Sequence, residues 1–516
     1  MSPDDHAKLK AAVDTLAFVT AELQTKQTSL DRLRRLLFGA KTEKMHTIVG
    51  PDAAPGAPGP GASPSAAAGP PRSGHGRTSA AAYTGADTVK IAHPSLRRGD
   101  RCPGCTRGRI YPLAEPATLV RITGMAPLGA TVYECERWRC NLCGEVFTAP
   151  APAGVGAAKY DATATSMVGL LKYGCGLPFH RLETLQRAMR IPLPAATQWE
   201  LVRDATPQLV PAWDELIRQA AQGEVVYNDD TTMKVLALTA EQRRAAADDE
   251  ETDARTGVFT SGIVATGDGH RIALFFTGRQ HAGENLADVL AQRAADLGPP
   301  IQMCDALATN TAGDFDTLLA NCLAHARRRF VDVVEHFPTE VRHVLETLRE
   351  VYRTDALARE RTLSPDERLR FHQTESGPLM AGLETWLRQQ FDDHLVEPNS
   401  GLGAAIAYML KHWAPLTLFL RVPGAPLDNN VCERALKKAI LHRKNALFYT
   451  SLAGARVGDV FMSLIHTAEL NGIAPFEYLV ALQRHHQDVA LDPSEWLPWN
   501  YEATLAELRA RASPSR

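Results

Sequence analysis

The sequence predicts a mixed α/β fold with much helix, and three observations lead to this prediction. Short β-prone runs bounded by turn signals indicate strands; they occur at 225–227, 259–266, 271–277, 301–304 and, as a candidate fifth strand, 318–322. A helix-forming segment at 284–297 separates the third strand from the fourth. From 339 to about 420 the apolar residues recur at helical spacing. Strands that alternate with helices in this way favour a sheet covered by helices.

Composition limits the classes of function. The 516 residues suggest about three or four domains. The 56 Lys and Arg against 59 Asp and Glu give a net charge of −3, which excludes a histone-like polycation, so any DNA binding must come from local basic patches. The first residues are acidic where a secretory signal needs a basic segment, and no apolar run approaches the roughly 18 residues of a membrane-spanning helix. We therefore expect a cytoplasmic protein without a membrane partner.

The N-terminal segment has leucine at every seventh position, namely Leu9, Leu16, Leu23, Leu30 and Leu37. This spacing is typical of a coiled coil. We expect a coiled-coil-like helix over 5–45, which either pairs with a second copy or packs on its own chain.

Residues 50–90 are mostly Pro, Gly, Ala and Ser, which bury too little apolar surface to offset chain entropy. We expect this segment to be a disordered linker.

Four of the nine cysteines form two Cys-x-x-Cys pairs, Cys102 with Cys105 and Cys140 with Cys143. In a cytosolic protein such pairs indicate zinc ligands, so 91–152 is predicted to be a zinc-finger-like domain with one structural Zn²⁺. The 34 residues between the pairs exceed the usual separation in four-cysteine zinc sites, and Cys135 could compete as a ligand.

Another Cys and His, Cys322 and His325, also have ligand-like spacing. A pair on a basic helix more often serves packing and a phosphate contact, so no metal site is predicted there.

Residues 158–222 contain three helical patterns that are interrupted at 174–176 by Gly-Cys-Gly and at 192–194 by Pro-Leu-Pro. Three short helices with tight turns are typical of a helix-turn-helix-like DNA-binding unit. Units of this kind also serve as scaffolds, and the pattern does not decide between the two roles.

Two aspartates stand at the ends of apolar strands, Asp229 after Val-Val-Tyr-Asn and Asp305 after Ile-Gln-Met-Cys. Such side chains project from the rim of a sheet, where carboxylates can hold the divalent cations that catalyse phosphoryl transfer. Two aspartates provide too few ligands, and Glu433, just inside a predicted helix, is the candidate third acid. From 434 to 456 there are six Lys or Arg and no acid, a basic field suited to phosphate contacts.

Five sequence phrases point to a known family. They are Asn228-Asp229-Asp230-Thr231, Cys322-Leu323-Ala324-His325-Ala326-Arg327-Arg328-Arg329-Phe330, Leu427-Asp428-Asn429-Asn430 with Glu433-Arg434, His442-Arg443-Lys444-Asn445, and Asn471-Gly472-Ile473-Ala474-Pro475. Together they resemble the DDE transposases of the insertion-sequence sixty-six family. The resemblance extends over nearly the whole chain, because family members also carry an N-terminal helix that ends in Leu-Phe-Gly and a Cys-x-x-Cys segment.

The resemblance implies a ribonuclease-H-like core in which Asp229, Asp305 and Glu433 hold the catalytic metal, Mg²⁺ or Mn²⁺, with two ions per site. Asp229 is preferred over Asp230, because neighbouring residues of a strand face opposite sides. An all-helical insertion would interrupt this core. The implied divisions are 223–338 for the first part of the core, 339–425 for the insertion, 426–486 for the completion of the core with the Glu433 helix, and 487–516 for a C-terminal tail.

The implied reaction is hydrolysis of one phosphodiester at each transposon end, followed by attack of the freed 3′-hydroxyl on target DNA. The residues implied in holding DNA are Arg434, Lys437, Lys438, Arg443, Lys444, Asn445, Arg327, Arg328 and Arg329. Action on two ends implies a homodimer or a larger assembly, and small accessory proteins encoded by the same element are candidate partners. Two alternatives stay open: a catalytically silent DNA-binding protein descended from transposases, and a metal-dependent nuclease that cuts without joining.

Overall fold

The computed structural model describes residues 94–101, 126–139, 146–150, 152–153, 156, 158–239, 257–313 and 315–512. The predicted N-terminal helix, the predicted linker and the four predicted zinc ligands, Cys102, Cys105, Cys140 and Cys143, lie outside these residues. The chain divides into two units, Gly56–Gly129 and the remainder. All elements described below belong to the remainder, and the first two, β1 (Arg137–Arg139) and β2 (Val146–Thr148), form an antiparallel pair.

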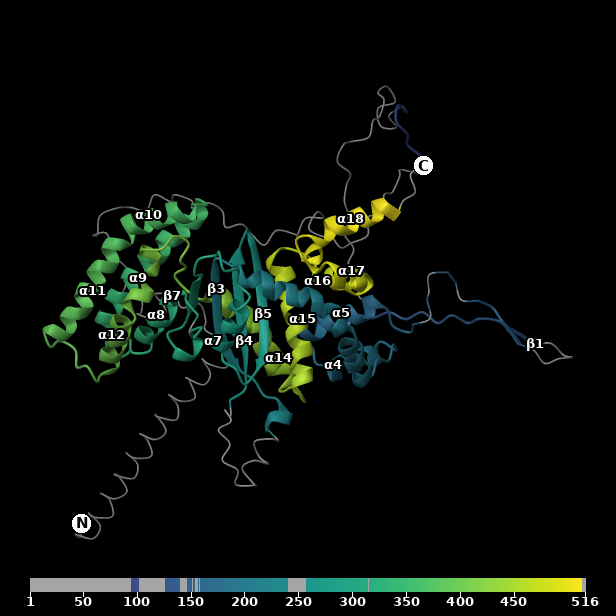
Figure 1. The fold of residues 1–516 in the computed structure, drawn as a ribbon, viewed down its shortest axis with the longest axis horizontal. Coiled ribbons are helices and arrows are strands. Elements are labelled where there is room, and N and C mark those ends of the chain that lie inside the picture. Colours follow the sequence, from purple (N-terminus) through teal and green to yellow (C-terminus); the bar gives the residue numbers. More distant parts are fainter. Residues whose placement is uncertain are drawn as a thin grey trace, which may run out of the picture. The chain divides into compact units, whose positions relative to one another are not determined.

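A five-stranded mixed sheet organises the chain from residue 225 to residue 321 (Figure 1). Its strands are β3 (Val225–Thr232), β4 (Phe259–Gly267), β5 (His270–Gly278), β6 (Ile301–Cys304) and β7 (Leu318–Asn321). Their spatial order is β5-β4-β3-β6-β7; β4 is antiparallel to β3 and β5, whereas β6 and β7 run parallel to β3. The five predicted strands and the mixed α/β class are confirmed.

Helices α14 (Asn430–Ala446) and α7 (Ala282–Leu290) cover opposite faces of β3 and β4. Adjacent residues of β4 identify the two faces, because successive strand residues point to opposite sides. Gly262 faces α14, where an added Cβ would lie 2.9 Å from a leucine of that helix. The neighbouring Ser261 faces α7 and accepts a hydrogen bond from Asn285 at 2.9 Å. The glycine therefore lets α14 lie close against the sheet.

The outer edge of β5 is covered by helix α15 (Leu452–Leu470) and its C-cap residue. Side chains four residues apart accept hydrogen bonds from alternate backbone N–H groups of β5: Asp459 from Thr277, Ser463 from Phe275, Thr467 from Ala273 and Asn471 from Arg271, at 2.8 to 3.2 Å. Four residues of a helix advance about 6 Å and two residues of a strand about 6.8 Å. Every fourth side chain of α15 can therefore reach every second N–H group of β5 along the whole contact. The helix thereby occupies an edge that could otherwise pair with another chain.

Residues 158–222 form three helical segments, as predicted. They are α3 (Ala162–Gly169), which continues into a π-helical turn (Leu170–Gly174), α4 (Phe179–Ala188) and α5 (Ala195–Ala221). The prediction of three short helices is wrong for α5, which has 27 residues and packs against α3, α15 and the sheet. Its buried apolar stripe continues to Leu216, and packing of that stripe outweighs the cost of two internal prolines, Pro207 and Pro211.

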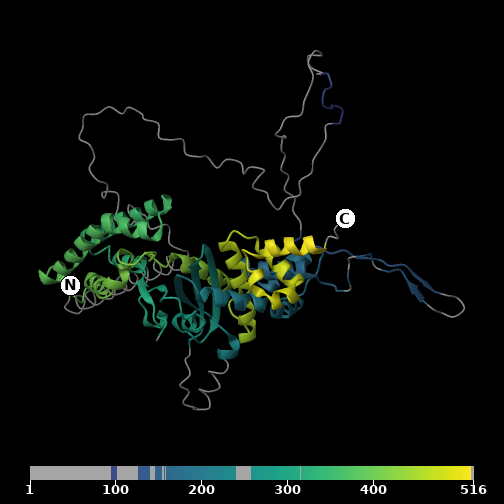
Figure 2. The same cartoon turned by 45° about the horizontal axis from the view of Figure 1, so that its top comes forward.

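The described chain between β7 and α14 contains helices and no strand, as the helical spacing of its apolar residues from 339 to about 420 predicts. Its helices are α8 (Leu323–Val331), α9 (Pro338–Glu360), α10 (Pro365–Glu375), α11 (Gly377–Asp392), α12 (Gly401–Lys411) and α13 (Trp413–Leu416), followed by a 3₁₀ turn (Leu418–Leu420). Helix α10 begins with a capping box, in which the side chains of Ser364 and Glu367 each accept a hydrogen bond from the backbone N–H of the other residue. These helices, in green, lie together in Figures 1 and 2, and α13 contacts β7.

The chain after α15 is helical as far as it is described. It forms α16 (Pro475–Arg484), α17 (His486–Leu491), a 3₁₀ turn (Pro493–Trp496) and α18 (Tyr501–Ala512). Trp496 and Tyr501 are buried, and the hydroxyl of Tyr478 donates to the carbonyl of Trp496 at 3.0 Å. The predicted tail therefore begins as packed structure.

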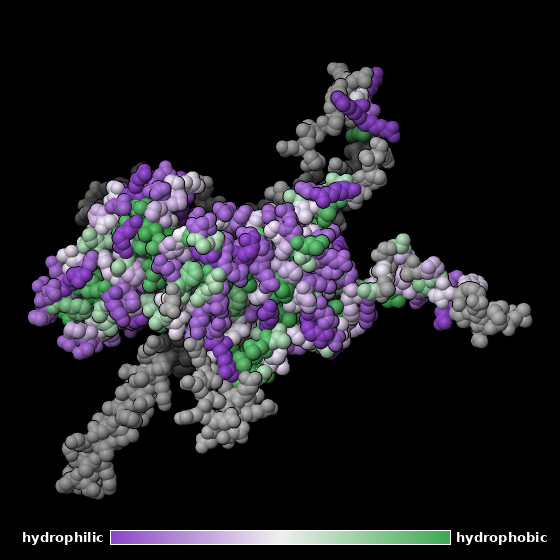
Figure 3. Space-filling view, viewed as in Figure 1, coloured by the Kyte–Doolittle hydropathy of each residue, from purple (hydrophilic) through white to green (hydrophobic). Residues whose placement is uncertain are grey.

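None of the described helices combines the length and apolar character needed to span a bilayer. The face of the molecule in Figure 3 is mostly hydrophilic, with hydrophobic residues interspersed.

Candidate active site

Asp229 and Asp305 meet just beyond the parallel pairing of β3 with β6. The last pair places Tyr227 opposite Met303, and each aspartate lies two residues further along. The prediction that Asp229 ends its strand is wrong, because β3 continues to Thr232 in its pairing with β4. The side-chain amide of Asn310 joins them: its Nδ2 donates to Oδ1 of Asp305 at 2.6 Å and to Oδ1 of Asp229 at 3.5 Å. The structure thus brings two predicted acids together and adds an amide that sequence analysis missed.

Asp230 points to the opposite face of the sheet. Its carboxylate accepts from the hydroxyl of Ser261 at 2.7 Å and from the backbone N–H of Ala282 at 3.0 Å, and it lies 2.9 Å from Nδ1 of His281. These partners belong to β4 and to the start of α7, so Asp230 joins that helix to the sheet. The strand alternation used to prefer Asp229 matches this arrangement.

Glu433 approaches the aspartates from the first turn of α14. The residue before that helix, Asn429, donates from Nδ2 to the backbone carbonyl of Asn228 at 3.0 Å. This bond fixes the start of α14 beside the residue that precedes Asp229. The negative charge of Glu433 acts on Asp229 and contributes to the raised pKa of its carboxyl group.

The pKa of Asp229 is raised to about 7, mainly by burial and then by the charges of Asp305, Glu433 and Asp230. The backbone N–H of Asp230, which donates to Oδ1 of Asp229 at 2.8 Å, opposes this shift. Burial and like charges both disfavour the ionised carboxylate. A divalent cation would remove this penalty, because it supplies the missing positive charge.

Four buried amide side chains lie beneath the acids: Asn228, Gln302, Asn310 and Asn429. Nδ2 of Asn228 and Nε2 of Gln302 both donate to the carbonyl of Asn310 at 2.7 Å, and Gln302 also donates to Oδ1 of Asn228 at 3.0 Å. Fully buried amides must be hydrogen-bonded, so this network holds the loop after β6 against β3. The sequence contained a signal for two of these amides, because Asn228 and Gln302 each interrupt an otherwise apolar strand segment.

The predicted DNA-binding residues of α14 fall into two groups. Arg434, Lys437 and Lys444 are exposed. The others have partners within the protein: Lys438 binds the carbonyl of Gly174 and the carboxylate of Glu469, Asn445 binds the carbonyl of Gly176, and Arg443 binds the side chains of Thr231 and Thr232 and the carbonyl of Thr232 at the end of β3. The basic run is therefore partly structural.

The predicted arginines of α8 lie on the helix that follows β7. Arg327 is half-buried, whereas Arg328 and Arg329 are exposed. The guanidinium of Arg329 lies 3.8 Å from the ring centroid of Tyr408 on α12, a cation–π contact that orients it. These arginines begin two residues after His325, whose Nε2 lies 3.8 Å from Oε1 of Glu433.

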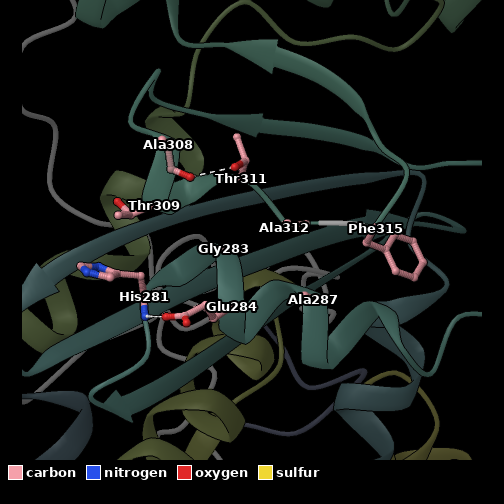
Figure 4. Close-up of a pocket in the computed structure, with 10 residues that line it drawn as sticks. His281, Gly283, Glu284, Ala287, Ala308, Thr309, Thr311, Ala312 and Phe315 are labelled. Carbon is pink, nitrogen blue, oxygen red and sulfur yellow. Dashed lines mark hydrogen bonds between the residues drawn. The ribbon is translucent and has the colours of Figure 1, made fainter. Parts of the chain in front are cut away.

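A cavity of about 590 Å³ lies between α7 and the segment from 308 to 315 (Figure 4). It is lined by His281, Gly283, Glu284, Ala287, Thr309, Thr311 and Phe315, among others. Figure 4 shows the cap at the start of α7, where the carboxylate of Glu284 accepts from the backbone N–H of His281 at 2.8 Å. None of Asp229, Asp305 and Glu433 lines this cavity, so it belongs to the α7 side of the sheet and does not contain the acids.

Comparison with known proteins adds a family relationship. Residues 158–457 match a family model described as "Transposase IS66 family". The chain is 26% identical over 528 aligned residues to "Uncharacterized protein y4jD" of Sinorhizobium fredii (strain NBRC 101917 / NGR234), covering 96% of this chain and 98% of that protein. It is 27% identical over 429 residues to "Uncharacterized protein y4hP" of the same organism, covering 78% of this chain and 74% of that protein.

Proposed function

The chain belongs to the IS66 family of transposases, as its sequence phrases indicated, and from this premise we propose that it is a DDE-type DNA transposase. The proposed reaction is metal-dependent cleavage at the ends of an insertion sequence and transfer of the freed 3′-hydroxyl ends into target DNA. The observation that supports it most is that Asn310 joins Asp229 to Asp305 and that the charge of Glu433, on α14, acts on Asp229. Phosphoryl transfer by two metal ions needs carboxylates that lie close together.

The proposed core is ribonuclease-H-like. It is supported by the order of its elements: three antiparallel strands, helix α7, and then two strands parallel to the first. The proposed helical insertion at 339–425 would account for much of the long separation between Asp305 and Glu433, and α9 to α13 occupy this range.

Asp229, Asp305 and Glu433 are the proposed ligands of Mg²⁺ or Mn²⁺, two ions per site. The donor set fits, because hard cations prefer carboxylate oxygen. In the described part of the chain, Oε1 of Glu433 and Oδ1 of Asn310 are buried without a hydrogen-bond partner. Bound ions would activate the nucleophile and stabilise the leaving oxygen. The role of Asn310 is to hold the two aspartate carboxylates in place.

The raised pKa of Asp229 predicts pH-dependent metal binding. A carboxyl group with a pKa of about 7 must lose its proton before it binds a cation, so Mn²⁺ affinity should increase as the pH rises through 7 and level off above it. Without metal, the raised pKa stabilises the folded protein at low pH, and this contribution is lost as the pH rises through 7. Calorimetric titration with Mn²⁺ and thermal unfolding, both at pH 6, 7 and 8, test this.

Asp229→Asn should weaken Mn²⁺ binding and reduce its pH dependence, and should reduce the pH dependence of unfolding as well. Asp288→Asn is the matched control, because Asp288 is an exposed acid of α7 and should leave both dependences as they are in the wild type. Identical pH dependence in Asp229→Asn and the wild type would show that Asp229 is not the titrating group.

Lys437 and Lys444 are the proposed phosphate contacts of α14, because both are exposed. Replacing both by Ala should reduce the slope of log affinity against log salt by about 2, one for each lost phosphate contact. Arg443→Ala should instead lower stability, because Arg443 binds Thr231 and Thr232. Binding of end-containing DNA at several salt concentrations measures the slope. An unchanged slope in the double variant would contradict the contact.

Several further parts of the proposal concern segments outside the described residues or partner molecules. Cys102, Cys105, Cys140 and Cys143 are proposed to bind one structural Zn²⁺. The helix at 5–45 is proposed to pair with a second copy in a homodimer or larger assembly. Small accessory proteins are proposed partners, and the proposed place of action is the cytoplasm. DNA contact by the helical unit at 158–222 is also proposed, with α4 as its most exposed helix. Gel filtration of the full chain and its zinc content address the assembly and the zinc site.

The test of the function is a strand-transfer assay. The purified full chain is incubated with labelled insertion-sequence ends, target DNA and Mg²⁺ or Mn²⁺, and cleavage and joining are followed separately. A transposase gives nicked ends and joined products. Nicks without joined products would favour the nuclease, and DNA binding with no reaction, even when the accessory proteins of the element are supplied, would favour a silent binding protein.

A further inference from the structure

A second cluster of metal-ligating side chains adjoins the three acids and shares one of them. It consists of Cys322, His325 and Glu433, whose ligand atoms all lie within 4.8 Å of one another. Cys322 directly follows β7, and His325 lies three residues later in the first turn of α8. Residues three apart at a helix start face the same side, and Glu433 reaches that side from α14, with its Oε1 3.8 Å from Nε2 of His325.

The surrounding backbone holds this cluster together. The N–H of Asn429 donates to Sγ of Cys322 at 3.2 Å, and the N–H of Leu323 donates to the carbonyl of Leu427 at 3.0 Å. These bonds join the start of α8 to the segment before α14, so that the thiol and the glutamate keep their relative positions. Cys322 is 1% exposed, whereas the His325 and Glu433 side chains are 27% and 29% exposed, which leaves an approach for an ion.

One polar atom of the cluster lacks a partner. Oε1 of Glu433, the atom that faces Nε2 of His325, is buried without a hydrogen bond among the described residues. Buried polar atoms are nearly always satisfied in folded proteins, and an exception calls for an explanation such as a missing ion. A carboxylate oxygen is a good donor to a metal.

We propose that Cys322, His325 and Glu433 bind Zn²⁺, and that this ion inhibits the enzyme by removing Glu433 from the catalytic site. A thiolate, an imidazole and a carboxylate suit Zn²⁺, whereas Mg²⁺ favours oxygen ligands alone. In a tetrahedral zinc site the ligand atoms lie about 3.5 Å apart, so side-chain movements of about 1 Å would close the cluster. The inhibitory role rests on the proposed function, but the binding site does not.

Zinc content tests the site. Full-chain wild type, Cys322→Ser and His325→Gln are equilibrated with Zn²⁺, freed of loosely bound ions and analysed for metal. The wild type should retain one more zinc ion per chain than either variant, since any zinc on Cys102, Cys105, Cys140 and Cys143 is common to all. Cys304→Ser is the matched control, because Cys304 is another buried thiol near the acids outside the cluster, and it should retain the wild-type content.

The result that would overturn the site is equal zinc content in the wild type and in both variants, each folded by circular dichroism. If Cys322→Ser does not fold, His325→Gln alone decides, because His325 is partly exposed and its replacement leaves the buried thiol in place.

A zinc titration of the strand-transfer assay tests the inhibition. Joining by the wild type should be lost at a Zn²⁺ concentration at least ten times lower than in His325→Gln, each measured against its own zinc-free rate. Equal sensitivity would overturn the inhibitory role. Absence of joining in every protein without zinc would count against the proposed function, while the zinc content would still decide the site.

Discussion

Replacing Glu433 by Gln is expected to abolish both cleavage and joining, with a loss of at least about 10³-fold, or about 4 kcal/mol of transition-state stabilisation. The substitution keeps the volume and shape of the side chain. It removes a negatively charged ligand from the three that converge at the end of the sheet, and a neutral amide holds a hard cation far less well than a carboxylate does. Loss of one charge should also lower the pKa of Asp229, since Glu433 helps to raise it.

The measurement is the rate of formation of nicked and joined DNA under single-turnover conditions, with DNA affinity measured in parallel. Asp288→Asn serves as the control, because it removes an exposed carboxylate from α7 and should leave both rates near those of the wild type. Glu433→Gln should still bind end DNA. Retention of joining within tenfold of the wild-type rate would exclude Glu433 as the third acid and direct attention to another carboxylate.

Replacing Asp459 by Ala is expected to destabilise the protein by about 2–4 kcal/mol. Asp459 is buried and accepts from both the N–H and the hydroxyl of Thr277, at 2.8 and 2.7 Å. Its removal leaves the N–H of Thr277 without an acceptor, while the hydroxyl of Thr277 keeps only Thr260, at 2.8 Å. An unsatisfied buried group costs about 1–3 kcal/mol, and the loss of the second bond adds to this cost. The change should also expose part of a strand edge, so we expect increased aggregation.

Chemical unfolding followed by circular dichroism measures the stability, and light scattering measures the aggregation. Asp459→Asn should lose less than Asp459→Ala, because an amide oxygen still accepts one bond. Asp488→Ala is the surface control: Asp488 is an exposed acid of α17 that pairs with His485 at 3.4 Å, and its loss should cost less than about 1 kcal/mol. Equal stability of Asp459→Ala and the wild type would contradict the role of α15 as the cover of the sheet edge.

The acids could be found from the sequence because their positions depend on local patterns. Asp229 and Asp305 follow short apolar runs, and such runs form the buried strands of a sheet. The choice between Asp229 and Asp230 needed only the alternation of a strand. Glu433 was harder to place, since 128 residues separate it from Asp305, and its selection depended on the family resemblance as well as on the neighbouring basic run.

The supporting residues could not be found in the same way. Asn310 belongs to a loop with no periodic pattern, and its role depends on bonds to Asp305 and Asp229. The sequence shows that the run from 434 to 456 is basic, but it does not show which of its side chains have partners within the protein. Lys438 and Arg443, which have such partners, could therefore not be distinguished from the exposed Lys437. The spacing of Cys322 and His325 does not by itself predict a metal site, because it does not show that Glu433 approaches them from α14.

The sequence by itself determined the family through its phrases, and the mixed α/β class and the five strands through apolar periodicity, which records which face of each segment is buried. It also indicated Asp229 and Asp305 as candidate acids. Only the tertiary structure decided which segments meet. The bond from Asn429 to Asn228 joins residues 201 positions apart, and the bonds from β5 to α15 join residues 182 to 200 positions apart. Such contacts depend on how the whole chain packs, and no local pattern encodes them. The site is therefore composed of locally predictable acids and of partners that packing alone supplies.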